Sequence, residues 1–345
     1  MIRVALRCDA SPAIGGGHVM RCLALAEALS ACGCGLLLLV RPGTSEVAPA
    51  LSRFHSCDVR IIEGRAASAV SAIAAHWPSG ADLVIVDSYA SDAEYETALR
   101  SAGRKIMVVD DLANRKHDCD LLLDQTCGRQ GAAYGGLVPA RARVLAGSRY
   151  ALLRAEFAAL RHEASRRREE CPSVDRVLIA MGLTDVGGGT LSIARAALAT
   201  GLAMRFDVVV GAKADSLAPL EALARKHSSV HTHVDPADLG RLMLEADIGI
   251  GALGMMTLER CCLGLPSIGV VLADNQRATA EEIDRAEAAL VIRDTAELDA
   301  LLPQMLRQLT SDPPLRLRLS RNALSLVDGQ GSQRVAEAIL ETVCG

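Results

Sequence analysis

Aromatic residues are scarce in this sequence: three Phe, four Tyr and one Trp make up 2% of 345 residues. Half of the residues are nevertheless hydrophobic, so packed cores built from Ala, Leu, Val and Ile are expected. The chain also lacks a long basic run, and its formal net charge is -4. This charge argues against nucleic acid or an anionic membrane surface as the main partner.

Membrane and secretion signals are missing as well. No stretch of about twenty uninterrupted apolar residues occurs, so no segment is expected to span a membrane. Arg3, Arg7 and Asp9 interrupt the first ten positions, which excludes the apolar run of a signal peptide there. The eleven cysteines are odd in number and form no CxxC pair or zinc-type spacing. Free thiols in a reducing cytoplasm are therefore expected, with no metal.

The chain has two halves of the same architecture. Its length predicts two domains, at about 150 residues each. Strands such as Leu83-Val84-Ile85-Val86 are apolar without alternation, which is typical of a parallel sheet covered by helices on both faces. The strands predicted in the first half are 2–7, 35–41, 59–62, 82–87, 105–110 and 119–124. Those predicted in the second half are 177–181, 206–210, 230–234, 248–251, 267–272 and 289–292.

The expected fold is therefore α/β, with two doubly wound Rossmann-like domains facing a central cleft. A charged helical segment broken by Cys171-Pro172-Ser173 marks the boundary between them. We expect an N-terminal domain over 1–158, a linker over about 159–172 and a C-terminal domain over 173–345.

A glycine-rich stretch near the start carries the main functional signal: Gly15-Gly16-Gly17-His18-Val19-Met20-Arg21. It lies between the first strand and a helix predicted over 19–31. Glycines let the backbone approach a ligand closely, and a helix N-terminus favours anions and disfavours protonation of a nearby histidine. His18 is thus predicted to be a neutral general base beside an anionic substrate. The alternative is a glycine-rich turn with a helix-capping histidine, since this is neither a dinucleotide fingerprint nor a P-loop.

Polar residues gather after the predicted strands of both halves. They are Asp9, the group Asp87-Ser88-Tyr89, the pair Asp110-Asp111, the pair Thr184-Asp185, the run 251–254 and the group Asp274-Asn275-Gln276. Each alone is typical of a helix cap or a turn. Their concentration at the carboxyl ends of strands, where ligands bind in such sheets, favours a binding site.

The second half offers a place for a diphosphate and a ribose. Residues 251–257 form a loop and a helix N-terminus that would bind an anion. Glu259 lies in the first turn of that helix, where a carboxylate can accept hydrogen bonds from two ribose hydroxyls. The alternative is that Glu259 only favours the helix dipole. Among the other polar residues, His117 is expected to be solvated, His231 and His233 lack a third metal ligand, and Tyr134 is expected to pack.

Several separated blocks resemble one known family. They are 15–26, 86–89, 110–113, 117–125, 150–157, 275–276 and Glu259-Arg260-Cys261-Cys262-Leu263-Gly264-Leu265-Pro266. In these blocks, which span about residues 1–280, the chain resembles the UDP-2,4-diacetamido-2,4,6-trideoxy-β-L-altropyranose hydrolases of pseudaminic acid biosynthesis. That family is similar to two-domain GT-B glycosyltransferases.

The resemblance implies a role for each half. His18 would serve a water that displaces UDP from the anomeric carbon with inversion, without metal or other cofactor. The second domain would hold UDP through Gly182, Thr184, Gly254, Met255, Met256 and Glu259. The sugar, the water or His18 would be held by Gly17, Arg21, Asp9, Asp87, Tyr89, Asp111, Asn275 and Gln276. The partner is then a UDP-sugar, with neither nucleic acid nor membrane, and the protein is expected to act as a cytoplasmic monomer.

Two alternatives stay open. The same donor site would serve a GT-B glycosyltransferase that passes the sugar to an acceptor. Alternatively, the chain is a nucleotide-sugar binder that has lost turnover. This second alternative depends on three departures from the family pattern, because Leu183 and Leu253 stand where the family commonly has glycine, and Met255 replaces a hydroxyl-bearing residue that would donate to phosphate.

Overall fold

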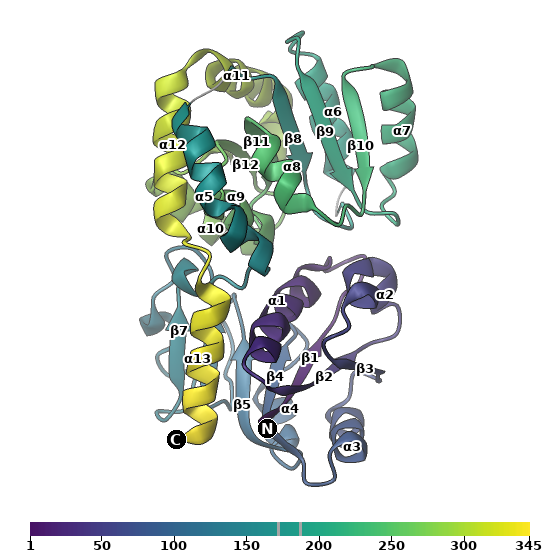
Figure 1. The fold of residues 1–345 in the computed structure, drawn as a ribbon, viewed down its shortest axis with the longest axis vertical. Coiled ribbons are helices and arrows are strands. Elements are labelled where there is room, and N and C mark those ends of the chain that lie inside the picture. Colours follow the sequence, from purple (N-terminus) through teal and green to yellow (C-terminus); the bar gives the residue numbers. More distant parts are fainter. Residues whose placement is uncertain (171–172, 186–187) are drawn as a thin grey trace. The chain divides into compact units, whose positions relative to one another are not determined.

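The computed structural model describes residues 1–170, 173–185 and 188–345. The chain forms two compact units (Figure 1). Unit 1 comprises Met1–Ser11, Gly16–Ala155 and Gln330–Gly345, and unit 2 comprises Pro12–Gly15 and Glu156–Gly329. Each unit is an α/β structure built on a parallel sheet, as the sequence predicts.

Unit 1 holds a parallel sheet of seven strands in the order β3-β2-β1-β4-β5-β6-β7. The strands are β1 (Arg3–Cys8), β2 (Gly35–Val40), β3 (Asp58–Ile61), β4 (Ala81–Asp87), β5 (Gly103–Val109), β6 (Leu121–Asp124) and β7 (Arg143–Ala146). The strand order reverses between β1 and β4, which pair from Val4 with Leu83 to Cys8 with Asp87. In doubly wound sheets the carboxyl ends of strands at such a reversal bind ligands.

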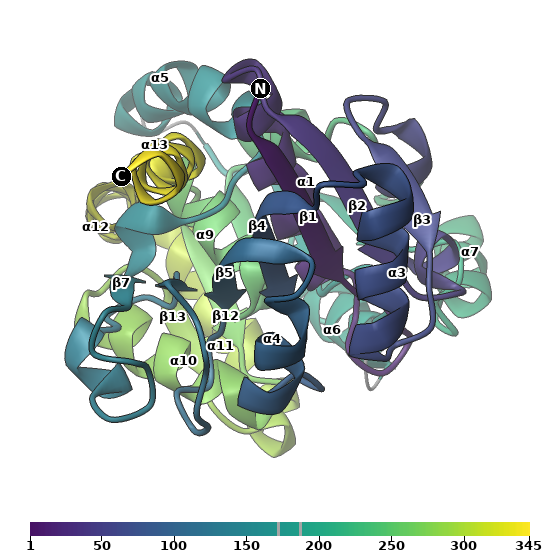
Figure 2. The same cartoon turned by 90° about the horizontal axis from the view of Figure 1, so that it is seen from below.

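Helices cover both faces of this sheet. They are α1 (Gly17–Ala31), α2 (Thr44–Val47), α3 (Ala66–His76), α4 (Ala93–Leu99) and α13 (Gly331–Cys344). Leu25 and Leu29 of α1 share a core cluster with Val335 and Ile339 of α13 on one face. The opposite face buries Ile73 of α3 and Leu99 of α4 in another cluster. Figure 2 shows α1 and α3 on the two sides of the β1–β2 region.

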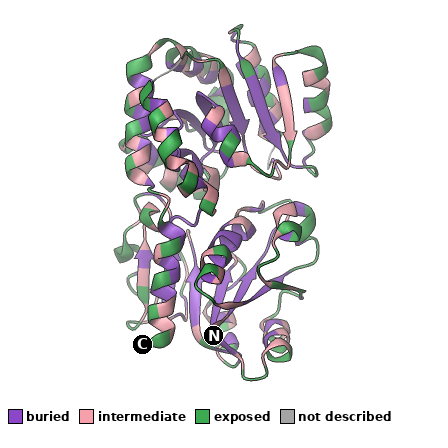
Figure 3. Cartoon of the chain, in the orientation of Figure 1, coloured by how far each residue is buried: buried purple, intermediate pink, exposed green. Residues whose placement is uncertain are grey.

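Unit 2 repeats the design with six strands in the order β10-β9-β8-β11-β12-β13. They are β8 (Arg176–Ala180), β9 (Arg205–Val210), β10 (Val230–Val234), β11 (Ile248–Ala252), β12 (Ser267–Val270) and β13 (Leu290–Ile292). The helices are α5 (Ala155–Glu170), α6 (Gly189–Leu198), α7 (Leu217–Lys226), α8 (Leu239–Glu245), α9 (Met255–Cys262), α10 (Arg277–Arg285), α11 (Leu298–Ser311) and α12 (Pro313–Leu326). The order reverses between β8 and β11. The strands are largely buried (Figure 3).

The predicted strands agree with the observed ones to within about two residues at each end. One strand was not predicted: β7 is short, carries the exposed Arg143, and is followed by Gly147, which has φ +98°.

The compact units also differ from the expected domain boundaries. The C-terminal helix α13 lies in unit 1, because its apolar face completes the core against α1. Helix α5 lies in unit 2, where the Arg168 side chain donates to the carbonyls of Met243 and Ala246.

Candidate functional site

The glycine-rich stretch forms the predicted turn before a helix. Gly15 has φ +76°, a left-handed conformation that favours glycine. Helix α1 begins at Gly17, so His18 is its second residue. The His18 side chain is buried, and it lies at the carboxyl ends of β1 and β4, where the strand order reverses.

Asp87, the last residue of β4, holds His18 in one orientation. Its Oδ1 lies 2.5 Å from Nδ1 of His18. Because a carboxylate only accepts, Nδ1 carries the proton of this hydrogen bond, and a neutral ring then has its lone pair on Nε2. Nη2 of Arg21 also lies 3.0 Å from Nδ1. The arrangement is that of a base positioned by a second group.

Arg21, one turn along α1, closes this cluster. Its Nε and Nη2 donate to the two carboxyl oxygens of Asp87, both at 2.6 Å. Burial alone would raise the pKa of Asp87, but the charges and hydrogen bonds of Arg21 and His18 outweigh it and hold that pKa well below its ordinary value. Asp87 is therefore a carboxylate at neutral pH although it is fully buried.

Asp111 and Tyr89 extend the cluster toward the next strand. Nη1 of Arg21 donates to Asp111 at 3.0 Å, and the Tyr89 hydroxyl donates to the other oxygen of Asp111 at 2.9 Å. The Tyr89 ring meets the His18 ring edge to face, with centroids 4.6 Å apart. The structure thus connects His18, Arg21, Asp87, Tyr89 and Asp111, all of them predicted from the sequence.

Asp9, also predicted for this site, makes other contacts. It accepts from both terminal nitrogens of Arg7, at 2.5 and 2.8 Å, and from the backbone N–H of Arg41 at 3.2 Å. These bonds tie the end of β1 to the end of β2. Asp9 thus holds the carboxyl edge of the sheet together.

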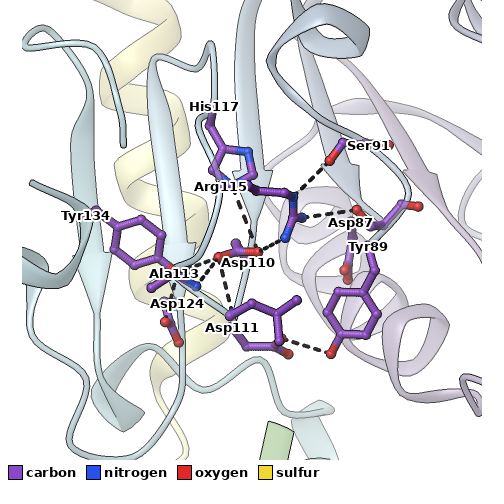
Figure 4. A network of polar contacts seen from close by, with 12 residues as sticks. Asp87, Tyr89, Ser91, Asp110, Asp111, Ala113, Arg115, His117, Asp124 and Tyr134 are labelled. Atoms are coloured by element: carbon purple, nitrogen blue, oxygen red, sulfur yellow. Dashed lines mark hydrogen bonds and ion pairs between the residues drawn. The ribbon is translucent and has the colours of Figure 1, made fainter. Parts of the chain in front are cut away.

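A second buried network of polar side chains surrounds Asp110, the neighbour of Asp111 (Figure 4). The sequence did not predict its contacts. The Tyr134 hydroxyl lies 2.9 Å from carboxyl oxygens of both Asp110 and Asp124. Arg115 pairs with Asp110 at 2.8 Å. Asp110 also accepts from the backbone N–H of Ala113, which adopts φ +50°. The network holds the loop that carries Asp111, and it spans β5, β6 and a distant turn, so no local spacing reveals it.

One sequence prediction is corrected here, and another is extended. His117 is buried, not solvated: its Nδ1 lies 2.7 Å from Glu96, and its Nε2 lies 3.9 Å from Asp110. Tyr134 is buried as predicted, but it also bonds two carboxyl groups. Burial and the two carboxylates raise its pKa far above the ordinary value.

Unit 2 places several predicted residues around the start of α9. Gly254 is the N-cap of that helix and is exposed. The Gln276 side chain lies beside Gly254: if Gly254 had a Cβ, that atom would lie 3.9 Å from Nε2 of Gln276. Oε1 of Gln276 accepts from the backbone N–H of Leu272. Met255 and Met256 are half-buried in the first turn, and Glu259 is buried one turn later.

Leu253 does not obstruct this site. Its side chain is buried and packs against Gly269 of β12, where an added Cβ would lie 2.5 Å from Cδ2 of Leu253. Gly269 provides the space that a leucine at position 253 needs. The departure at Leu253 is therefore accommodated inside unit 2.

The loop after β8 carries Gly182 and Thr184. Gly182 has φ +133°, which favours glycine, and Thr184 is half-buried. Asp185 adopts φ +45°, and its Oδ1 accepts from the N–H and hydroxyl of Thr190 in α6. This bond ties the loop to the start of α6. Residues 186–187 lie outside the described residues.

A surface cavity in unit 1 is lined by none of the predicted site residues, although Asp9 bonds to the backbone of one lining residue, Arg41. Arg41, Pro42, Glu63, Gly64 and Arg65 line it, after β2 and β3. We place the site at His18, because the buried charges and the positioned ring lie there. In the described parts of the chain, no cluster of three His, Cys, Asp or Glu is arranged to hold a metal ion. His233 lies 2.6 Å from Asp207, with which it pairs.

No helix of the described residues combines the length and the apolar character needed to cross a lipid bilayer.

Comparisons with known proteins agree with this architecture. No protein-family model matches the sequence. The chain is 27% identical over 280 residues to UDP-2,4-diacetamido-2,4,6-trideoxy-beta-L-altropyranose hydrolase of Campylobacter jejuni, covering 81% of this chain and 95% of that protein. It is 32% identical over 125 residues to a UDP-N-acetylglucosamine–N-acetylmuramyl-(pentapeptide) pyrophosphoryl-undecaprenol N-acetylglucosamine transferase of Xanthomonas campestris, covering 34% of this chain and 29% of the transferase.

The fold matches solved GT-B structures. The crystal structure of Acinetobacter baumannii MurG aligns with a TM-score of 0.68 at 17% identity, covering 99% of this chain and all of that one. The chain therefore has the GT-B fold, with two Rossmann-like units.

Proposed function

We propose that this chain, a GT-B protein similar over most of its length to a UDP-sugar hydrolase, hydrolyses a UDP-linked 2,4-diacetamido-2,4,6-trideoxy hexose to UDP and the free sugar, as a step of pseudaminic acid biosynthesis. The observation that carries the proposal is the buried pair of His18 and Asp87, 2.5 Å apart at a strand reversal. The similarity to the Campylobacter jejuni hydrolase supports the choice of substrate.

In this proposal His18 is the general base. Its Nε2 takes a proton from water as the water oxygen bonds to the anomeric carbon and the bond from that carbon to the UDP oxygen breaks. Attack on the face opposite the leaving group inverts the anomeric centre. Asp87 keeps the ring oriented and stabilises the imidazolium that forms, because it is a buried carboxylate on Nδ1. Arg21, Tyr89 and Asp111 would hold the sugar or the water.

Unit 2 would bind the nucleotide. The first-turn N–H groups of α9, at Gly254, Met255 and Met256, would stabilise the charge of the departing diphosphate. Glu259 would accept from the ribose hydroxyls. Gln276, which lies beside Gly254, and its neighbour Asn275 would contact phosphate or sugar. Gly182 and Thr184 would line the nucleotide from the loop after β8. No step of this reaction calls for a metal or another cofactor.

A transferase is the second candidate, because MurG has the same fold and the Xanthomonas campestris transferase is similar in sequence over a third of this chain. It would use the same donor site and pass the sugar to an acceptor hydroxyl. A binder without turnover is favoured less, since Leu253 packs against Gly269 within unit 2.

The test is phosphorus NMR of the purified protein with the 6-deoxy-altrose UDP-sugar and a chelator. Wild-type protein should release UDP, and His18→Ala should release it about 10²- to 10⁴-fold more slowly, since general base catalysis contributes that much. His55→Ala, which removes an exposed histidine of unit 1, is the matched control and should keep the wild-type rate. An undiminished rate in His18→Ala would refute the base. Release of UDP only when an acceptor is added would establish the transferase.

A further inference from the structure

Arg260 of α9 is a buried cation without a matching anion. It is 3% exposed. Its Nη2 donates to the carbonyl of Ala252 at 2.9 Å and lies 3.1 Å from the Thr257 hydroxyl. Its Nε and Nη1 are buried and have no hydrogen-bond partner. Among the residues the structure describes, no carboxylate forms an ion pair with it; the charge of the preceding residue, Glu259, acts on it only through space. A buried ion is costly unless other groups compensate it.

Arg168 is also deeply buried in unit 2, and burial strongly lowers its pKa as well. The positive charge of Arg168, however, is compensated by hydrogen-bond acceptors. Its terminal nitrogens donate to the carbonyls of Met243, Leu244 and Ala246 at the C-terminal end of α8. A helix C-terminus is partly negative and suits a cation. Arg260 instead places its positive charge near a helix N-terminus, because its side chain reaches back to Ala252 and Thr257 at the start of α9. The guanidinium thus adds positive charge to a helix end that is already partly positive.

The neighbouring strand is shaped to admit this charge. A Cβ on Gly251 of β11 would collide with Nη1 of Arg260, and one on Gly249 would lie 3.1 Å from its Cδ. Two glycines in one strand weaken it, and such positions often mark a close approach. Here they open the space in which the guanidinium lies, beside Ala252 at the carboxyl end of β11 and Thr257 in the first turn of α9.

We infer that Arg260 is a fixed positive charge that, together with the N-terminus of α9, attracts the diphosphate of the nucleotide bound there. The inference rests on the proposed function, and it makes Arg260 a positioning residue that acts through its charge. An anion at the helix end supplies the compensation that the ligand-free protein lacks. Burial lowers the pKa of Arg260 to about 10, so the charge is present at pH 7.

The test compares Arg260→Met with Arg168→Met, which removes a similarly buried arginine. Calorimetry measures UDP binding, ligand-observed NMR measures uridine binding, and thermal unfolding measures the ligand-free proteins. Arg260→Met should bind UDP about ten- to a hundred-fold more weakly, by the Coulomb energy of charges several ångströms apart, and should bind uridine like wild type. Its Tm should equal or exceed that of wild type, since an uncompensated charge is gone. Arg168→Met should lose Tm and keep its UDP affinity.

Three results would overturn the inference: equal UDP affinity in Arg260→Met, equal loss for UDP and uridine, or a Tm loss as large as that of Arg168→Met. If Arg260→Met does not fold, Arg260→Lys, which keeps the charge, and Arg260→Gln, which removes the charge and keeps a polar side chain, replace it. Arg260→Lys should retain most of the UDP affinity and Arg260→Gln should lose it. A wild-type protein that binds no UDP would refute the proposed function, and the inference with it. Wild-type binding that is unchanged in the variants would refute the inference alone.

Discussion

At the scale of single residues, the environment of His18 comes from three elements. Helix α1 places His18 and Arg21 one turn apart, β4 ends at Asp87, and the loop after β5 carries Asp111. Asp87 bonds both His18 and Arg21, so it links the base to the cation beside it. A change at Asp87 should therefore affect both catalysis and stability.

Asp87→Asn tests this double role. The amide cannot balance Arg21 or hold the His18 tautomer, so we expect UDP release to slow by about 10²- to 10⁴-fold through kcat, with KM little changed. The free energy of unfolding should fall by about 3–5 kcal/mol, because a buried cation loses its partner. Steady-state kinetics and urea denaturation measure the two effects.

The control for Asp87→Asn is Asp82→Asn, at the other end of β4. Asp82 accepts from the N–H and side chain of Arg3, which is partly exposed. This variant should lose less stability and keep the wild-type kcat. If Asp87→Asn instead kept its kcat, or if Asp87→Glu recovered none of the lost rate, the positioning role of Asp87 would be wrong.

At the scale of elements, charged side chains join neighbouring strands. Asp207 of β9 pairs with Arg176 of β8 and accepts from Arg205, and it lies 2.6 Å from Nε2 of His233 in β10. Burial works to raise the pKa of Asp207, but the hydrogen bonds of Arg205, Arg176 and His233 outweigh it and lower that pKa to about 2. Asp207 thus joins three strands of the unit 2 sheet through its ionised form.

The stability of unit 2 should depend on the ionisation of Asp207. Because the folded-state pKa lies below the unfolded value of about 3.9, the stabilisation is complete above about pH 4 and is lost as the pH falls through about 2. Asp207→Asn should therefore unfold more easily than wild type by about 2 kcal/mol at pH 7, and by about half as much at pH 3. Urea denaturation at pH 7, 5 and 3 measures this. A difference that is the same at all three values would contradict it.

At the scale of the whole molecule, each unit has its own core. The cores of unit 1 lie around its seven-stranded sheet, and that of unit 2 lies around the six-stranded sheet. A ligand that binds one unit stabilises that unit by mass action, by about 2.7 kcal/mol at a hundred times its Kd. UDP without a sugar should thus act on unit 2.

Hydrogen exchange with and without UDP measures this division. We expect slower exchange in β8, β11 and the first turn of α9, and little change in the β1–β7 sheet of unit 1. His18→Ala should show the same protection, since it keeps the nucleotide site. Protection confined to unit 1 would contradict the assignment of the nucleotide to unit 2.

The sequence alone determined the alternation of strands and helices and the two-unit α/β fold, and it predicted His18, Arg21, Asp87, Tyr89 and Asp111, which the structure connects. It could do so because buried parallel strands are apolar without interruption, and because polar residues cluster where such strands end. Strand ends were predicted to within about two residues for this reason.

Only the tertiary structure decided which distant side chains meet. The membership of α13 in unit 1, the burial of His117 and the bonding of Tyr134 to Asp110 and Asp124 all join segments far apart in the chain. In the sequence Arg260 is only one residue of the block 259–266, and only the structure shows that two of its nitrogens are buried without a hydrogen-bond partner. A one-dimensional pattern records local periodicity, whereas burial and charge compensation depend on packing between elements, which the strand order and helix placement establish.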